Sequence, residues 1–223
     1  MKWILFCLLL MPGALWAQDS QRWRDSLTVL NREIATAATW NADLHLRKAA
    51  ANLQLQQWQY AVDEYALILQ KEPQNPAALF YRAYANTHLR RYPLARADYQ
   101  TLLNIFPRHY EARLSLAYVL QLMNKQTDAL DQLNQTIEMH PDSATAYVAR
   151  ANLERLMKQN DAAVYDWQTA VRLAPQEVGY VASLADLLMT LGRRREARQV
   201  LDDAVRRNIP RGLLNEWYAK LGK

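Results

Sequence analysis

Cysteine, glycine and proline are scarce in this chain of 223 residues. The one cysteine, Cys7, lies in an N-terminal apolar segment, so the rest of the sequence has no thiol for a disulfide, a thiolate nucleophile or a cysteine zinc site. Only 5 glycines and 8 prolines are present, whereas an all-β fold needs many turns, which these residues favour. Because 51% of the residues are apolar, the chain can still bury a core. The composition predicts long helices with short connections.

Long apolar runs are also missing, and the short one near the N-terminus has the features of a secretory signal. In residues 1–17, Lys2 supplies a positive charge, residues 3–11 form the apolar run, and Ala17 is a small residue before the expected cleavage. The run is too short for a comfortable membrane-spanning helix, although an uncleaved signal anchor is the alternative. Cys7 is not preceded by the small residues typical of bacterial lipoprotein signals. We therefore expect a periplasmic or secreted protein without a lipid anchor.

Proline and alanine recur along the chain at intervals of 34 residues. The prolines are Pro73, Pro107, Pro141 and Pro175. The first alanine series is Ala49, Ala83, Ala117, Ala151 and Ala185, and the second is Ala61, Ala95, Ala129, Ala163 and Ala197. Two unbroken series with one shared period indicate an internal repeat of that length.

These series resemble the tetratricopeptide repeat family, whose pattern has small residues at positions 8 and 20, an aromatic residue at 24 and proline at 32. The aromatic position holds Tyr65, Tyr99, Leu133, Trp167 and Leu201. The resemblance implies an all-α solenoid of five helix-turn-helix repeats, in which small residues let paired helices approach and bulky residues fill the space between neighbouring units. The five repeats span residues 42–75, 76–109, 110–143, 144–177 and 178–211.

Both flanks of the repeats are expected to be capping helices. Residues 18–41 contain an amphipathic pattern over 20–38, and residues 212–223 belong to a closing helix predicted over 211–221. A solenoid needs such caps because its end repeats would otherwise expose an apolar face. The predicted shape is a curved rod with a concave face.

Patterns for catalysis or metal binding are not found in the sequence. The four histidines lack metal-ligand spacing and occupy different positions of the repeat: they are His45, His88, His109 and His140. No glycine-rich phosphate loop or serine–histidine–acid arrangement is recognisable. The acids are spread through the predicted helices, where most are expected to pair with cations one turn away on the surface. We therefore expect no enzyme activity, no cofactor and no bound metal.

The concave face is the expected binding site, because family members that this chain resembles place positions 5, 9 and 12 of each repeat's first helix there. Transferred by position, the predicted groove consists of Phe80, Tyr84, Leu114, Tyr118, Gln121, Asn152, Arg155 and Asp186. The aromatic and apolar members would anchor a peptide and the polar members would bind its backbone. The alternative is that several of them only pack within the solenoid. Position 5 is apolar throughout, so the basic clamp that some relatives use for a terminal carboxylate is not expected.

A cluster of arginines near the C-terminus is the second candidate surface. Its core is Arg193, Arg194, Arg195 and Arg198. The cluster could bind an acidic partner or an anionic membrane surface, or it could be a solvated end that nearby acids offset. The net charge of +5 becomes +4 if the signal, with Lys2, is removed. Nucleic acid is not an expected partner, since the cluster has no interleaved aromatic residues for base stacking.

Taken together, the export signal and the repeats predict a non-enzymatic scaffold of the bacterial cell envelope that binds a partner protein or peptide. Two alternatives remain at this point. One is a structural module that self-associates into a homo-oligomer, and the other is an accessory subunit of an envelope enzyme complex. The repeats do not identify the partner, because the fold is shared while the residues of the groove differ.

Overall fold

The computed structural model describes the chain from residue 13 to residue 222, with side chains from residue 19 onward. Within this range the regular structure is helical, which confirms the predicted all-α class. The helices are α1 (Gly13–Thr36), α2 (Ala42–Gln54), α3 (Trp58–Lys71), α4 (Pro76–His88), α5 (Tyr92–Ile105), α6 (Tyr110–Leu122), α7 (Gln126–Met139), α8 (Ala144–Leu156), α9 (Asn160–Leu173), α10 (Val178–Thr190), α11 (Arg194–Arg206) and α12 (Asn215–Leu221). Most of the predicted signal peptide, residues 1–12, lies outside the described residues.

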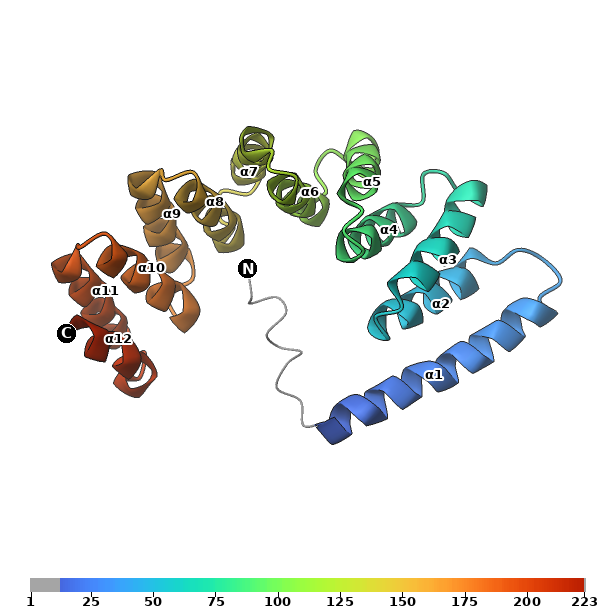
Figure 1. Ribbon diagram of the computed structural model, residues 1–223, viewed down its shortest axis with the longest axis horizontal. Coiled ribbons are helices and arrows are strands. Elements are labelled where there is room, and N and C mark those ends of the chain that lie inside the picture. Colours follow the sequence, from blue (N-terminus) through green and yellow to red (C-terminus); the bar gives the residue numbers. More distant parts are fainter. Residues whose placement is uncertain (1–12, 223) are drawn as a thin grey trace. The chain divides into compact units, whose positions relative to one another are not determined.

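Five helix pairs, from α2/α3 to α10/α11, follow one another along the chain (Figure 1). Their first helices begin 34 residues apart, at Ala42, Pro76, Tyr110, Ala144 and Val178. The predicted series of helix-turn-helix repeats is therefore confirmed.

The chain divides within the first turn of α6 into two compact units. Unit 1 ends at Ala112 and unit 2 begins at Arg113. In unit 1, each helix from α1 to α5 packs on the next one in the chain. In unit 2, the helices from α7 to α12 do the same. Packing between chain neighbours is the pattern of a solenoid, in which each helix buries its apolar stripe against the next.

The residue before each first helix caps that helix with its side chain. Asn75 Oδ1 accepts a hydrogen bond from the backbone N–H of Ala78 at 3.0 Å, and Ser143 Oγ accepts one from Ala146 at 3.2 Å. The full capping series also recurs every 34 residues and consists of Asn41, Asn75, His109, Ser143 and Glu177. Each cap satisfies a backbone donor that the helix leaves free and typically stabilises a helix by about 1 kcal/mol. The start of every repeat is thus fixed locally.

Both alanine series are buried at the contacts between helices. None of these ten alanines is more than 2% exposed. The position predicted to be aromatic is buried too, from Leu201 at 0% to Trp167 at 5% exposure. A methyl side chain at the first two positions lets two helices approach closely, and the larger side chain then fills the remaining space.

The two ends of the described chain differ from the repeats. α1 buries Leu30, at 1% exposure, and begins at Gly13, so it continues through the cleavage point expected after Ala17. The closing segment predicted as one helix over 211–221 is instead a 3-10 helix, Arg211–Leu214, followed by α12. The helix breaks at Leu214, whose backbone has φ −111° and ψ 2°. This break turns both Leu214 and Leu221 into the core of unit 2.

Candidate protein-binding surfaces

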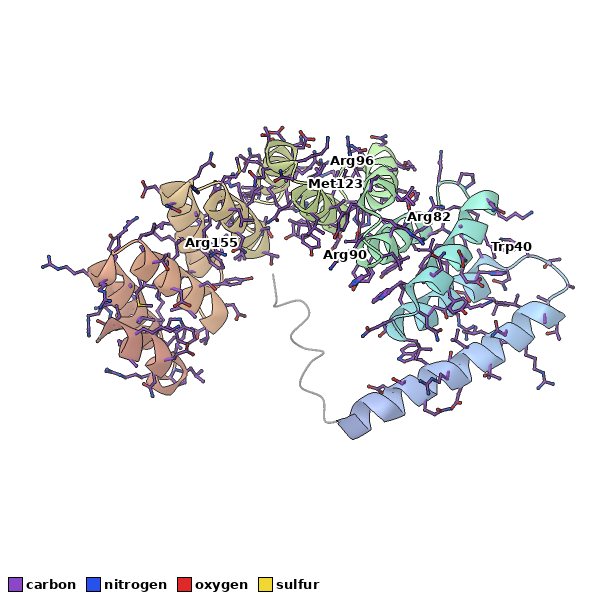
Figure 2. The ribbon with its side chains drawn as sticks, in the orientation of Figure 1. Trp40, Arg82, Arg90, Arg96, Met123 and Arg155 are labelled. Atoms are coloured by element: carbon purple, nitrogen blue, oxygen red, sulfur yellow. The ribbon has the colours of Figure 1, made fainter. Side chains whose placement is uncertain are left out.

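Three repeats contain an ion pair between their two helices. Arg82 of α4, labelled in Figure 2, donates to both carboxylate oxygens of Asp98 at 2.8 and 2.7 Å. Arg150 of α8 donates to Asp166 in the same way, at 2.6 and 2.8 Å. The third pair is Lys48–Glu64. The expectation that such acids pair with cations one turn away on the surface is wrong for these carboxylates, because each is buried and its partner comes from the other helix.

A second acid shares the cation of the α8/α9 pair. Glu154 is 7% exposed, and its Oε1 lies 3.9 Å from Arg150 Nε. Burial, and then the charge of Asp166, raise the pKa of Glu154 from 4.5 to about 7. One guanidinium therefore faces two carboxyl groups in a largely dehydrated contact.

Two of the predicted groove residues, Phe80 and Tyr84, lie on α4 of unit 1. Phe80 is partly buried, because its ring stacks on His109 with centroids 5.6 Å apart and meets the ring of Tyr99 at 5.7 Å. Tyr84 remains 39% exposed. Phe80 therefore contributes mainly to packing, whereas Tyr84 presents a surface.

Tyr84 belongs to a group of rings that we call the aromatic cluster: Trp58, Tyr84 and His88. The Trp58 and His88 rings are stacked, with centroids 4.0 Å apart and planes 4° apart. Tyr84 meets His88 edge-on at 4.6 Å and Trp58 at 6.0 Å. Trp58 is the first residue of α3, while Tyr84 and His88 lie one turn apart on α4, so the cluster joins two consecutive repeats. The sequence pattern did not predict this cluster, because Trp58 lies outside the predicted groove and His88 was assigned no role.

The other six predicted groove residues lie in unit 2, on the first helices of its pairs. They are Leu114, Tyr118 and Gln121 on α6, Asn152 and Arg155 on α8, and Asp186 on α10. Arg155 is exposed and the others are partly buried. Asp186 Oδ1 accepts a hydrogen bond from Lys220 Nζ of α12 at 3.3 Å. Each unit thus carries its own part of the predicted set.

Two of the arginines in the predicted C-terminal patch make contacts within unit 2. Arg193 donates to both carboxylate oxygens of Glu196 at 2.7 Å and lies 3.3 Å from Asp161. The hydrogen bond from Arg193 lowers the pKa of Glu196. Arg194 donates to the backbone oxygen of Leu221 at 3.5 Å. Arg194, Arg195 and Arg198 are all exposed, so three of the four arginines of the patch face solvent.

Each unit of the described chain contains a hollow. The first, of about 390 Å³, lies at the connection between α1 and α2 and is lined by Trp40, His45 and Lys71 among others (Figure 2 labels Trp40). The second, of about 500 Å³, lies between α9 and α11. Both Arg172 and Arg207, as well as Glu196 and Asp203, line the second hollow, so its charges are mixed.

Over residues 13–222 there is no group of three or more histidine, cysteine or acidic side chains that could hold a metal ion. In that range, too, no helix combines the length and the apolar character that crossing a membrane requires.

The family follows from a direct match. Residues 46–109 and 114–178, together more than half of the chain, match the model of the tetratricopeptide repeat. The chain belongs to the tetratricopeptide repeat family, as its 34-residue period predicts. Repeats of this family generally mediate contacts between proteins.

Individual relatives match only in part. The peptidyl-prolyl cis-trans isomerase FKBP4 of Homo sapiens is 30% identical over 96 residues, which cover 43% of this chain and 21% of that enzyme. A DnaJ homolog subfamily C member 7 homolog of Dictyostelium discoideum is 20% identical over 193 residues, covering 64% of this chain and 36% of the relative. The chain therefore spans well under half the length of these relatives.

Solved structures share the fold over more of the chain. MamA from Desulfovibrio magneticus, solved from residue 41 to its end, has a TM-score of 0.66 and 20% identity, covering 76% of this chain and 96% of that solved chain. A tetratricopeptide repeat protein from Parabacteroides merdae has a TM-score of 0.69 and 19% identity, covering 92% of this chain and 85% of that protein. At these identities the likeness shows a common fold.

Proposed function

We propose that this protein is a non-enzymatic adaptor of the bacterial cell envelope that binds a partner protein through the first helices of its repeats. The observation that carries the proposal is the exposure of Tyr84, 39%, on the first helix of a repeat, where its ring also contacts Trp58 and His88. Half-exposed tyrosines held in place by neighbouring rings are frequent anchors of protein interfaces. The family as a whole supports the same kind of function.

Binding is tested by cross-linking the tagged protein in its native envelope and identifying what copurifies. The variant carries Tyr84→Ala and Tyr118→Ala, which remove one predicted anchor in each unit. The matched control carries Tyr60→Ala and Tyr165→Ala, because these tyrosines are 65% and 64% exposed on the second helices α3 and α9. We expect one dominant partner that the first variant loses and the control keeps.

Two results would contradict the binding proposal. If the folded Tyr84/Tyr118 variant retained the partner as well as the wild type does, the first helices would not be the binding surface. If only the protein itself were recovered from every variant, self-assembly would replace the adaptor function.

Export rests on the charge, apolar run and small residue of segment 1–17. We expect to find the protein in the periplasmic fraction or the medium. Its intact mass should be that of a chain that begins at Gln18. A full-length mass in the cytoplasmic fraction would contradict the envelope part of the proposal and leave the binding part to the cross-linking experiment.

A further inference from the structure

We infer that the aromatic cluster, with Arg90 and Arg91 beside it, binds an acidic segment of the partner that carries an apolar side chain. This inference rests on the proposed function, because it names where unit 1 binds and what chemistry it selects. Since it uses internal acidic side chains of the ligand, it differs from capture of a terminal carboxylate.

The three rings form a preorganised apolar contact. The parallel stack at 4.0 Å and the edge contact at 4.6 Å hold Trp58, Tyr84 and His88 against one another. Trp58 is also packed against the core of the first repeat, which fixes its orientation. Tyr84 and His88 remain exposed to solvent. Rings that are already ordered lose little conformational entropy when a ligand binds, so they are efficient anchors.

Two arginines lie at the edge of this cluster. Arg91 Nη1 donates to Gln59 Oε1 at 2.6 Å, and Gln59 directly follows Trp58 in α3. Arg90 comes two residues after His88, in the turn where α4 gives way to α5, as Figure 2 shows. Its left-handed backbone, φ 59°, belongs to the regular turn of the repeat. Arg90 is therefore in the turn that directly follows the helix of Tyr84 and His88, and the Arg91 guanidinium lies beside the residue that follows Trp58.

The surrounding charge favours an acidic ligand. Residues 76–109 contain five arginines and a single acid, Asp98, which Arg82 already binds with two hydrogen bonds. The nearest acid on α3, Asp63, accepts a hydrogen bond from Gln59 at 2.7 Å. Arg90 and Arg91 thus outnumber the acid at this edge. Carboxylates of a ligand would complement this field, accelerate association and make binding sensitive to salt.

His88 supplies an internal reporter of the ligand's charge. Although one face of His88 is exposed, its contacts with the neighbouring rings bury part of the imidazole, and this partial loss of solvation lowers the pKa of His88. The imidazole is therefore neutral at neutral pH and adds to the apolar surface. A carboxylate bound alongside would favour the charged form and raise this pKa again.

The test uses two synthetic peptides that are acetylated at the N-terminus and amidated at the C-terminus. One has a single phenylalanine within a run of glutamates, and the other has glutamine in place of every glutamate. Binding is followed by fluorescence anisotropy at low and high salt, and by NMR of the Trp58 indole and of the His88 imidazole. We expect the glutamate peptide to bind at least about tenfold more tightly at low salt, a difference of about 1.4 kcal/mol. We also expect it to shift the Trp58 signal and to raise the pKa of His88.

Variants separate the proposed surface from general electrostatics. Tyr84→Ala and Arg90→Glu should each weaken binding of the glutamate peptide about tenfold or more. Arg108→Glu is the matched control, because it makes the same charge change at an exposed residue in the connection between α5 and α6. It should change binding less than about twofold. Equal binding of both peptides, unshifted Trp58 and His88 signals, or equal effects of Arg90→Glu and Arg108→Glu would overturn the inference.

Two further outcomes distinguish failure of the inference from failure of the proposed function. If the native partner is lost from the Tyr84/Tyr118 variant but retained by Arg90→Glu, the adaptor function stands and the acidic-ligand inference falls. Binding to anionic lipid vesicles that depends on Arg90, without discrimination between the peptides, would also overturn it in favour of a membrane surface. If the glutamate peptide binds as expected but the wild type recovers no partner from the envelope, the site stands and the adaptor function falls.

Discussion

Single residues in the turns of this protein carry backbone geometry that recurs with the repeat. One position in each turn has a left-handed conformation, with φ between 56° and 75°. These residues are Gln56, Arg90, Asn124, Lys158 and Gly192. A residue with a Cβ atom loses roughly 1 kcal/mol in this region, whereas glycine does not. Four of the five turns therefore contain a small local strain that the packing of the helices offsets.

The strain predicts that two substitutions at the left-handed position of the turns change the free energy of unfolding in opposite directions. Gly192→Ala should lower the free energy of unfolding by about 1 kcal/mol, although no atom lies within 4 Å of the added methyl group, because the cost comes from φ alone. Lys158→Gly should raise it by a few tenths to about 1 kcal/mol. Chemical denaturation measures both. Gly212→Ala is the control, since Gly212 also has open space around it but no positive φ; an equal loss there would show that backbone geometry is not the cause.

At the scale of the helix pair, charge is buried between elements as well as spread over their surfaces. Arg150 links α8 to Asp166 of α9, and Glu154 lies one turn further along α8. Removing only one partner from such a contact is costly, because it leaves a buried charge without compensation. Burial is the main reason that the pKa of Glu154 is raised, and the charge of Asp166 adds to it while the charge of Arg150 opposes it.

The raised pKa of this buried carboxyl group predicts a dependence of stability on pH. The pKa of Glu154 is about 7 in the folded protein against an ordinary 4.5, so the folded state binds more protons between these values. Stability from this group is therefore full below about pH 4.5 and is lost as the pH rises towards 7. Glu154→Gln resembles the protonated form, so it should be about 1–2 kcal/mol more stable than the wild type at pH 8 and nearly equal at pH 5.

Urea denaturation at both pH values measures this effect. The control is Glu138→Gln, which removes an exposed acid from α7 of the same unit. If Glu138→Gln were stabilised at pH 8 as much as Glu154→Gln, the effect would come from the change in net charge. The buried carboxyl group would then not be the cause.

At the scale of the whole molecule, helices contact mainly their neighbours in the chain, so stability is assembled locally. Unit 2 is closed by its C-terminal segment, where Leu214 is 0% and Leu221 is 9% exposed within one core. In such an arrangement a change at one end affects the adjacent repeat most.

Truncation of one side chain in this closing segment should therefore have a local effect. Leu214→Ala should reduce the free energy of unfolding by about 2–5 kcal/mol, because a fully buried leucine leaves a cavity. Hydrogen exchange resolved by segment should show faster exchange in α10 and α11 and unchanged exchange in α2 and α3. Leu213→Ala, one residue earlier and 56% exposed, should cost less than about 1 kcal/mol. Faster exchange throughout unit 1 would contradict the nearest-neighbour description.

The sequence by itself determined the repeat length, the helical class and the buried positions of the repeat. The alanine series predicted close helix contacts, and all ten alanines are buried. Part of the capping series was available from the sequence as well, since Asn41, Asn75 and Ser143 stand at one position of the repeat before three of the five first helices. These features follow from the sequence because they depend on local hydrogen bonds and on a period that one helix pair imposes on the next.

Only the tertiary structure decided which side chains meet across helices. Arg82 and Asp98 are 16 residues apart, and Trp58 and His88 lie at the start of α3 and at the end of α4. Periodicity cannot distinguish a surface acid from one that faces the paired helix, and it placed Phe80 and Tyr84 alike in the predicted groove. Packing separated them, because His109 and Tyr99 cover the ring of Phe80 while Tyr84 stays exposed beside Trp58. The physical reason is that the burial of a side chain depends on the size and direction of the side chains that pack against it from other helices. A residue's own position in the repeat does not specify these.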